Sequence, residues 1–155
     1  MIWPRAKLGM AMLLLSEGVF FFMLLLAFVY FRDESLKTAT ATLRLQTTSI
    51  YTACLLGSAF TLWRGWRKVT IVLGLVFALG QGSEYVRLLR SGVTMAQGLF
   101  GTTFFTLTGI HELHLLLGLA LLAALPRNQA AAMFWYFVVA VWMAVFAVVY
   151  LWTFL

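Results

Sequence analysis

Five long apolar stretches, separated by short polar segments, divide this chain. A run of about 18 or more mostly apolar residues predicts a transmembrane helix, because about 20 residues at about 1.5 Å each cross the hydrocarbon core of a bilayer. The pattern therefore predicts an all-α membrane protein, a bundle of five transmembrane helices that forms a single transmembrane domain over residues 1–155. The predicted helices are residues 8–31, 43–63, 69–89, 100–125 and 131–155.

The segments between the stretches carry the residues that end helices. Residues 32–42 are polar, residues 64–68 form a tight basic turn, and residues 90–99 contain two glycines. Pro126 and Asn128 separate the last two stretches. Proline interrupts a helix because it lacks a backbone N–H and its ring clashes with the preceding turn.

The basic residues predict an orientation. With five crossings the two termini lie on opposite sides, so Arg5, Lys7, the basic turn at 64–68 and Arg127 share one side. The positive-inside rule places that side in the cytoplasm, with the N-terminus inside and the C-terminus outside. The opposite side carries nearly as many basic residues, namely Arg32, Lys37, Arg44, Arg87 and Arg90.

Composition excludes most soluble functions. The chain is 63% hydrophobic and 10% charged, with a mean hydropathy of +0.97, whereas an ordinary soluble domain is about 25% charged. The net charge of +6 does not indicate a nucleic-acid partner, because the basic residues fall in short loops at the level of lipid headgroups. The single cysteine, Cys54, rules out an internal disulfide.

Three of the five acidic residues lie where hydrocarbon disfavours them: Glu17, Glu84 and Glu112. A carboxylate near the bilayer centre costs about 2.5–3.5 kcal/mol on insertion scales, so such residues are usually functional or paired. For Glu17 two interpretations stay open, a bond to a neighbouring helix that holds the bundle together and a proton-linked carboxyl near a partner subunit. Glu84 shares a helix face with Arg87, three residues on, and this spacing predicts an ion pair.

His111 and His114, three residues apart, are predicted to lie on one face of the fourth helix. Glu112 lies about 130° away from that face, since successive helical residues turn by about 100°, and should serve a different neighbour. Two histidines are too few for a metal site, and their spacing differs from that of the HExxH zinc motif. A bis-histidine haem needs ligands on facing helices, and nothing in the pattern supports a His/Met haem. We therefore expect no redox centre on this chain.

Four motifs, in order along most of the chain, resemble subunit III of haem–copper oxidases. The longest runs from Gly101 to His114 (GTTFFTLTGIHELH), at the family's paired histidines. The segment 16–22 (SEGVFFF) resembles the family's S-E-x-x-F-F segment, and 83–85 (SEY) resembles its S/F-E-Y segment. The last stretch shares aromatic and valine positions with the family's final helix, including Trp135 and Trp142, and we expect Trp142 to pack inside the bundle.

The resemblance implies a non-redox subunit of a cytochrome-c-oxidase-type oxidoreductase and proton pump in aerobic respiratory electron transport. Haem and copper would lie in the catalytic subunit I, beside this chain and a subunit II, in a bacterial inner membrane. The family's third subunit is thought to support proton uptake, protect the enzyme during turnover and bind phospholipid. By resemblance, Glu17 would be the carbodiimide-reactive carboxyl, and Glu84, His111 and His114 the intramembrane polar set, to which Glu112 is added here.

This chain also departs from the family. The seven-helix members carry two further N-terminal helices, and their phospholipids lie in a cleft between those helices and the rest. Glu112 replaces a glycine, and Tyr136 and Val139 replace the histidine and aspartate of the last helix. Alternatives are a subunit of a quinol oxidase or an accessory subunit of a nitric oxide reductase. A stand-alone channel or transporter would need a continuous polar pathway and a homo-oligomer.

Overall fold

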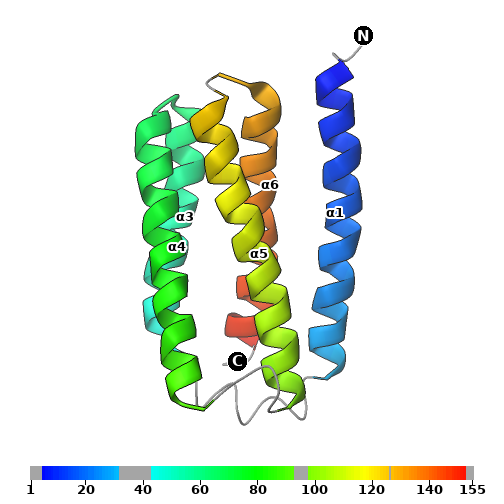
Figure 1. Cartoon of the computed structure of the whole chain (residues 1–155), viewed down its shortest axis with the longest axis vertical. Helices are drawn as coiled ribbons and strands as arrows, with labels where there is room; N and C mark the ends of the chain where they lie inside the picture. Colours follow the sequence, from blue (N-terminus) through cyan, green and yellow to red (C-terminus); the bar gives the residue numbers. More distant parts are fainter. Residues whose placement is uncertain (1–4, 32–42, 93–97, 126, 153–155) are drawn as a thin grey trace.

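A computed structural model describes residues 5–31, 43–92, 98–125 and 127–152, and the regular elements in these residues are helices (Figure 1). The five predicted helices are confirmed in this part of the chain, with ends that differ by a few residues. The last one continues without a break as a short π-helix, η1, which the hydrophobic pattern did not predict. The elements are α1 (Arg5–Tyr30), α3 (Leu45–Trp63), α4 (Arg67–Arg90), α5 (Leu99–Ala124), α6 (Gln129–Val145) and η1 (Phe146–Leu151).

Two predicted boundaries need correction. The turn between α3 and α4 is shorter than residues 64–68, because Arg67 already belongs to α4 and Gly65 makes the reversal with a φ of +81°. Glycine adopts this left-handed conformation without steric cost. At the other turn α6 begins at Gln129, because the side chain of Asn128 accepts a hydrogen bond from the Ala130 N–H at 2.8 Å and caps the helix. The predicted polar segment 32–42 lies outside the described residues.

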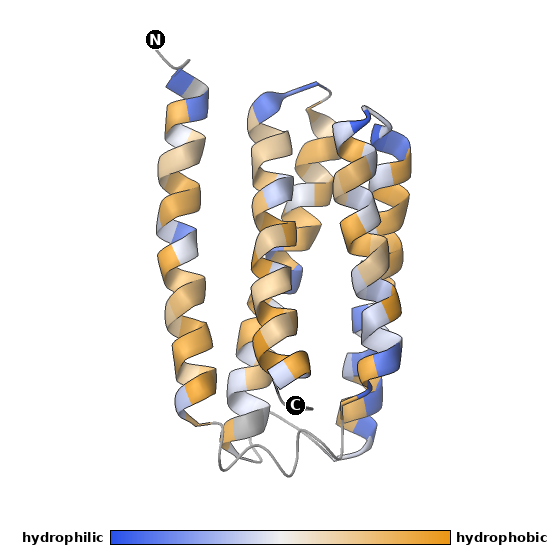
Figure 2. Ribbon diagram, turned by 180° about the vertical axis from the view of Figure 1, so that it is seen from behind, coloured by the Kyte–Doolittle hydropathy of each residue, from blue (hydrophilic) through white to orange (hydrophobic). Residues whose placement is uncertain are grey.

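Within the described residues, four helices are long and apolar enough to cross a membrane: α1, α4, α5 and the continuous α6–η1. Figure 2 shows hydrophobic colours along most of their length. The helix α3 is not among the four, because its many serines and threonines lower its hydropathy. It nevertheless runs antiparallel beside α4, with Thr61 bonded to Thr70 at 2.9 Å. Its crossing and the orientation of the termini stay predictions.

The core lies between α3, α4, α5 and α6, around the fully buried side chains of Phe77, Trp135 and Trp142. The helix α1 packs on the outside of this group, against α5 and α6 (Figure 1). Its buried anchors are Phe21 and Phe28, which are 2% and 3% exposed. The bundle therefore consists of four closely packed helices with one more helix attached to a side of it.

Glycines allow the closest approaches in the core. A Cβ atom on Gly74 of α4 would lie 2.7 Å from the Trp135 ring, and one on Gly118 of α5 would lie 3.0 Å from the same ring. Gly80 likewise faces the ring of Tyr51 on α3, 2.6 Å from where its Cβ would lie. Small residues at helix contacts are the usual means of close packing in membranes. The positions of both aromatic rings therefore depend on glycine backbones.

We predict that Gly74→Ala destabilises the bundle by about 1–3 kcal/mol, the usual cost of overpacking a core, because the new methyl group meets a rigid indole ring. Gly82→Ala on the same helix is the matched control. Nothing lies within 4 Å of its Cβ position, and alanine favours a helix by about 1 kcal/mol over glycine. Unfolding of the detergent-solubilised protein measures both, and equal effects would contradict the packing described here.

Candidate functional site

A carboxyl–imidazole pair joins α1 to α5. The Glu17 Oε2 atom lies 3.1 Å from the His114 Nε2 atom, and the two side chains are 32% and 19% exposed. The residues are 97 positions apart in sequence, so the contact arises from helix packing. Of the two interpretations of Glu17, the structure shows the contact with a neighbouring helix, and the partner is a histidine of α5.

The hydrogen bond of the second His114 nitrogen, Nδ1, limits the ways in which the Nε2 atom can bond to Glu17. The Nδ1 atom lies 2.8 Å from the Ile110 carbonyl oxygen, which can only accept, so Nδ1 carries a hydrogen. The Nε2 atom then either accepts a hydrogen bond from a protonated Glu17 or, in an imidazolium, donates one to the Glu17 carboxylate. Both arrangements hold one proton between the same two atoms. The geometry therefore places a carboxyl and an imidazole within hydrogen-bond distance of each other between two helices.

Aromatic rings from two other positions hold the imidazole in place. Phe21, one turn along α1 from Glu17, meets the His114 ring edge-on with centroids 5.1 Å apart. Phe134 of α6 stacks on the same ring, with centroids 6.1 Å apart and planes 12° apart. The His114 side chain is thus fixed from α1 and from α6, which keeps its Nε2 atom directed at Glu17.

His111 lies on the same side of α5 as His114, as the spacing predicted, and the ring of Phe21 contacts both imidazoles. Its partner is different. The fully buried His111 ring donates from Nε2 to the Val138 carbonyl oxygen of α6 at 3.1 Å, and Trp142 packs against it with centroids 5.0 Å apart. His111 therefore ties α5 to α6. Within the described residues, no group of three His, Cys, Asp or Glu side chains could hold a metal ion.

Glu84 and Arg87 form the predicted ion pair near the end of α4. Both the Nε and Nη2 atoms of Arg87 contact the Glu84 Oε2 atom, at 3.0 and 2.5 Å. The glutamate is buried, while the arginine side chain is 26% exposed. This contact lies within one helix, so it neutralises a buried carboxylate without linking two elements.

Glu112 takes no part in the carboxyl–imidazole pair. In the described part of the chain it makes no hydrogen bond or ion pair, and its charge acts on Tyr85 of α4. One turn earlier on α5, Thr108 accepts the hydrogen bond of the Tyr85 hydroxyl at 2.7 Å. Glu112 therefore belongs to the side of α5 that faces α4.

Two interhelical bonds made by tryptophans were missing from the sequence analysis. The Trp142 indole N–H donates to the Thr52 hydroxyl at 3.0 Å, and the Trp135 indole N–H donates to the Ser58 hydroxyl at 3.2 Å. Both acceptors lie on α3. The expectation that Trp142 packs inside the bundle is confirmed, since the residue is 1% exposed. Thr52 and Ser58 are six residues apart, and this spacing does not predict a contact with any particular helix.

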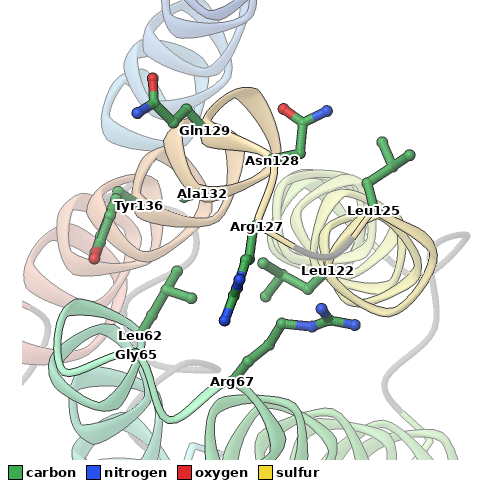
Figure 3. A pocket seen from close by; sticks show the side chains of 10 residues that line it. All are labelled: Leu62, Gly65, Arg67, Leu122, Leu125, Arg127, Asn128, Gln129, Ala132 and Tyr136. Atoms are coloured by element: carbon green, nitrogen blue, oxygen red, sulfur yellow. The ribbon is translucent and has the colours of Figure 1, made fainter.

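A basic pocket lies at the end of the bundle where the α3–α4 and α5–α6 turns meet (Figure 3). Its volume is about 220 Å³. Figure 3 shows the Arg67 and Arg127 side chains reaching into it from opposite sides. Arg67 also donates to the Ala123 carbonyl at the end of α5 at 3.0 Å, and Arg127 has a φ of +62°. Leucines, Tyr136 and other uncharged residues form the rest of the described lining.

Comparison with known proteins identifies relatives of one kind. Residues 66–154, more than half of the chain, match the family described as Cytochrome c oxidase subunit III. A probable cytochrome c oxidase subunit 3 of Mycobacterium leprae is 39% identical over 108 residues, covering 61% of this chain and 53% of the relative. Cytochrome c oxidase subunit 3 of Corynebacterium diphtheriae is 37% identical over 101 residues, covering 56% and 49%. The human protein is 37% identical over 98 residues, covering 54% and 36%.

This chain therefore spans about half the length of the bacterial relatives and about a third of the human one. The relatives are subunits of an oxidoreductase complex, and the apolar helices agree with a multi-pass membrane protein.

We predict that Glu17 and His114 are energetically coupled. Each single change to alanine should weaken the bundle, and the double variant should lose less than the sum, because hydrogen bonds between membrane helices average about 0.6 and reach about 1.7 kcal/mol. Unfolding in mixed detergent micelles measures the stability of the wild type, the two single variants and the double variant. The pair Glu17→Ala and Glu112→Ala is the control and should be additive. Additivity in the Glu17–His114 cycle would show that the contact contributes nothing.

Proposed function

The chain belongs to the cytochrome c oxidase subunit III family, and we propose that it is the non-redox third subunit of a terminal haem–copper oxidase. Its place would be a bacterial inner membrane, in aerobic respiratory electron transport, which agrees with its similarity to subunits from two bacteria. Haem and copper would be held by the catalytic subunit I, with subunit II nearby. The role of this chain would be to support proton uptake and the stability of the catalytic subunit.

The observation that carries this proposal is the 3.1 Å contact between the Glu17 carboxyl and the His114 imidazole, a pair of groups that can share a proton. A subunit without electron-transfer chemistry can still serve a proton pump if it holds an exchangeable proton within the membrane. The pair is partly exposed on the outer side of the bundle, where α1 meets α5, so a neighbouring subunit could reach it. The buried His111 and Glu84 have other partners, Val138 of α6 for His111 and Arg87 of the same helix for Glu84, and we assign them structural roles.

The alternatives from the same family differ in electron donor and acceptor. A quinol oxidase and a nitric oxide reductase would each carry a different catalytic subunit. Purification in mild detergent, followed by identification of the copurifying subunits and a visible spectrum, separates them. We expect a haem–copper oxygen-reducing subunit. Isolation of this chain as a conducting homo-oligomer would instead favour a stand-alone channel.

A bound phospholipid is the second part of the proposal, and the basic pocket supports it. Two guanidinium groups face an uncharged lining at the level where lipid headgroups meet the ends of the helices. Arginine binds phosphate in a planar, bidentate manner. The left-handed φ of Arg127 is rare for a residue with a side chain, and such strain gathers at ligand contacts.

We predict that Glu17→Ala leaves the haem spectrum of the complex unchanged and accelerates its loss of activity during turnover, because the chain holds no haem but supplies the proton site. Repeated-turnover oxygen consumption measures the decay. Glu112→Ala, which removes another carboxyl of the membrane-spanning part, should decay like the wild type. Loss of haem from the Glu17→Ala complex would count against the assignment.

We predict that Arg127→Gly lowers the amount of anionic phospholipid retained by the purified complex several-fold. Glycine keeps the left-handed turn and removes the guanidinium group, so the fold should persist. Native mass spectrometry counts the lipids. Arg64→Gln, at the same end of the bundle but outside the pocket lining, is the control. Equal retention in the Arg127→Gly and wild-type complexes would refute the lipid site.

A further inference from the structure

A second polar cluster lies at the end of the bundle opposite the basic pocket, where the start of α3, the last turns of α4 and η1 come together (Figure 1). Its members Thr48, Gln81, Glu84 and Tyr150 are 1%, 3%, 6% and 1% exposed. Within the described residues, the Thr48 Oγ1 and Gln81 Nε2 atoms are buried and have no hydrogen-bond partner. Buried polar atoms are nearly always bonded, so two orphans in one cluster call for an explanation.

The register of the helices brings the two orphaned atoms to the same level. Thr61 is bonded to Thr70, and Tyr51 lies against Gly80, so antiparallel α3 and α4 place Thr48 opposite the turn that contains Gln81 and Glu84. Tyr150 enters from η1, and its phenol interacts with Thr48 and with the charge of Glu84. Even beside the Tyr150 phenol, the Thr48 Oγ1 atom lacks a partner in hydrogen-bond geometry.

We propose that this cluster binds at least one ordered water molecule, shared by Gln81 Nε2 and Thr48 Oγ1. The Gln81 amide N–H requires an acceptor, whereas the Thr48 hydroxyl can donate or accept. The Arg87 guanidinium beside the cluster disfavours a cation, and the Glu84 carboxylate disfavours an anion. Water is neutral and both donates and accepts, so it satisfies all the groups at once.

The water solvates polar groups that lie at buried positions of this end of the bundle. It solvates the Glu84 carboxylate, and the Arg87 side chain, which is 26% exposed, opens the cluster toward the headgroup region. Protons of the cluster can then exchange with the medium although its side chains are buried. This inference depends on the packing of α3, α4 and η1, and not on the proposed oxidase role.

Isosteric apolar variants distinguish a wet site from a dry one. If the site is dry, Thr48→Val and Gln81→Met remove orphaned polar atoms and should raise the melting temperature of the purified complex. If water is bound, each variant loses hydrogen bonds to it and should lower the melting temperature by about 2–4 °C, a shift that corresponds to about 1 kcal/mol. A rise or no change in the two variants overturns the proposal.

The double variant adds a test that a simple packing defect would not pass. Thr48 and Gln81 do not bond each other, so a shared water predicts that their effects are less than additive, whereas independent defects add. Thr47→Val and Gln46→Met, neighbouring positions on α3 outside the cluster, are the matched control pair and should add. In a density map of the complex that resolves waters, we expect density about 2.7–3.2 Å from both orphaned atoms. The absence of such density, or additive effects of Thr48→Val and Gln81→Met, would overturn the proposal.

Discussion

The structure depends on one constraint, that a polar group within a membrane-spanning bundle must find its partner inside the protein. The tryptophans of α6 satisfy it by donating to hydroxyls of α3, as Trp142 does to Thr52 and Trp135 to Ser58. The same bonds give a purpose to the hydroxyl side chains of α3, which is not among the four helices apolar enough to cross a membrane. Hydroxyl groups lower the hydropathy of α3, and two of them also bind it to α6 by accepting hydrogen bonds from the tryptophans.

The elements were predictable because hydrophobic length alone decides where a chain can cross a bilayer. Local spacing predicted two further features. Residues three apart share a helix face, so the Glu84–Arg87 pair and the common side of His111 and His114 followed from the sequence. The helix ends moved by a few residues because they are fixed by individual side chains and turns, such as the cap made by Asn128.

The remaining features arise from the way distant segments pack, which no short pattern records. Glu17 and His114 are 97 residues apart, and only the position of α1 on α5 brings them together. The π-helical turn was likewise hidden, because the last apolar stretch contains no residue that interrupts an ordinary helix there. It places Tyr150 among the polar side chains of α3 and α4. The sequence motifs identify polar residues such as Glu17 and His114, but only the tertiary structure shows which of them lie in contact.

The peripheral position of α1 makes its polar contact serve two purposes. In its most apolar window only 11% of the residues are buried, against 50% for the last span, so few contacts hold α1 to the other helices. Glu17 provides one of them and is also the carboxyl to which we assign a proton-linked role. Selection therefore cannot tune the acidity of this carboxyl and the tethering of its helix separately. A mutation that removes the Glu17 carboxyl also removes a contact between α1 and α5, so a compensating change must restore both.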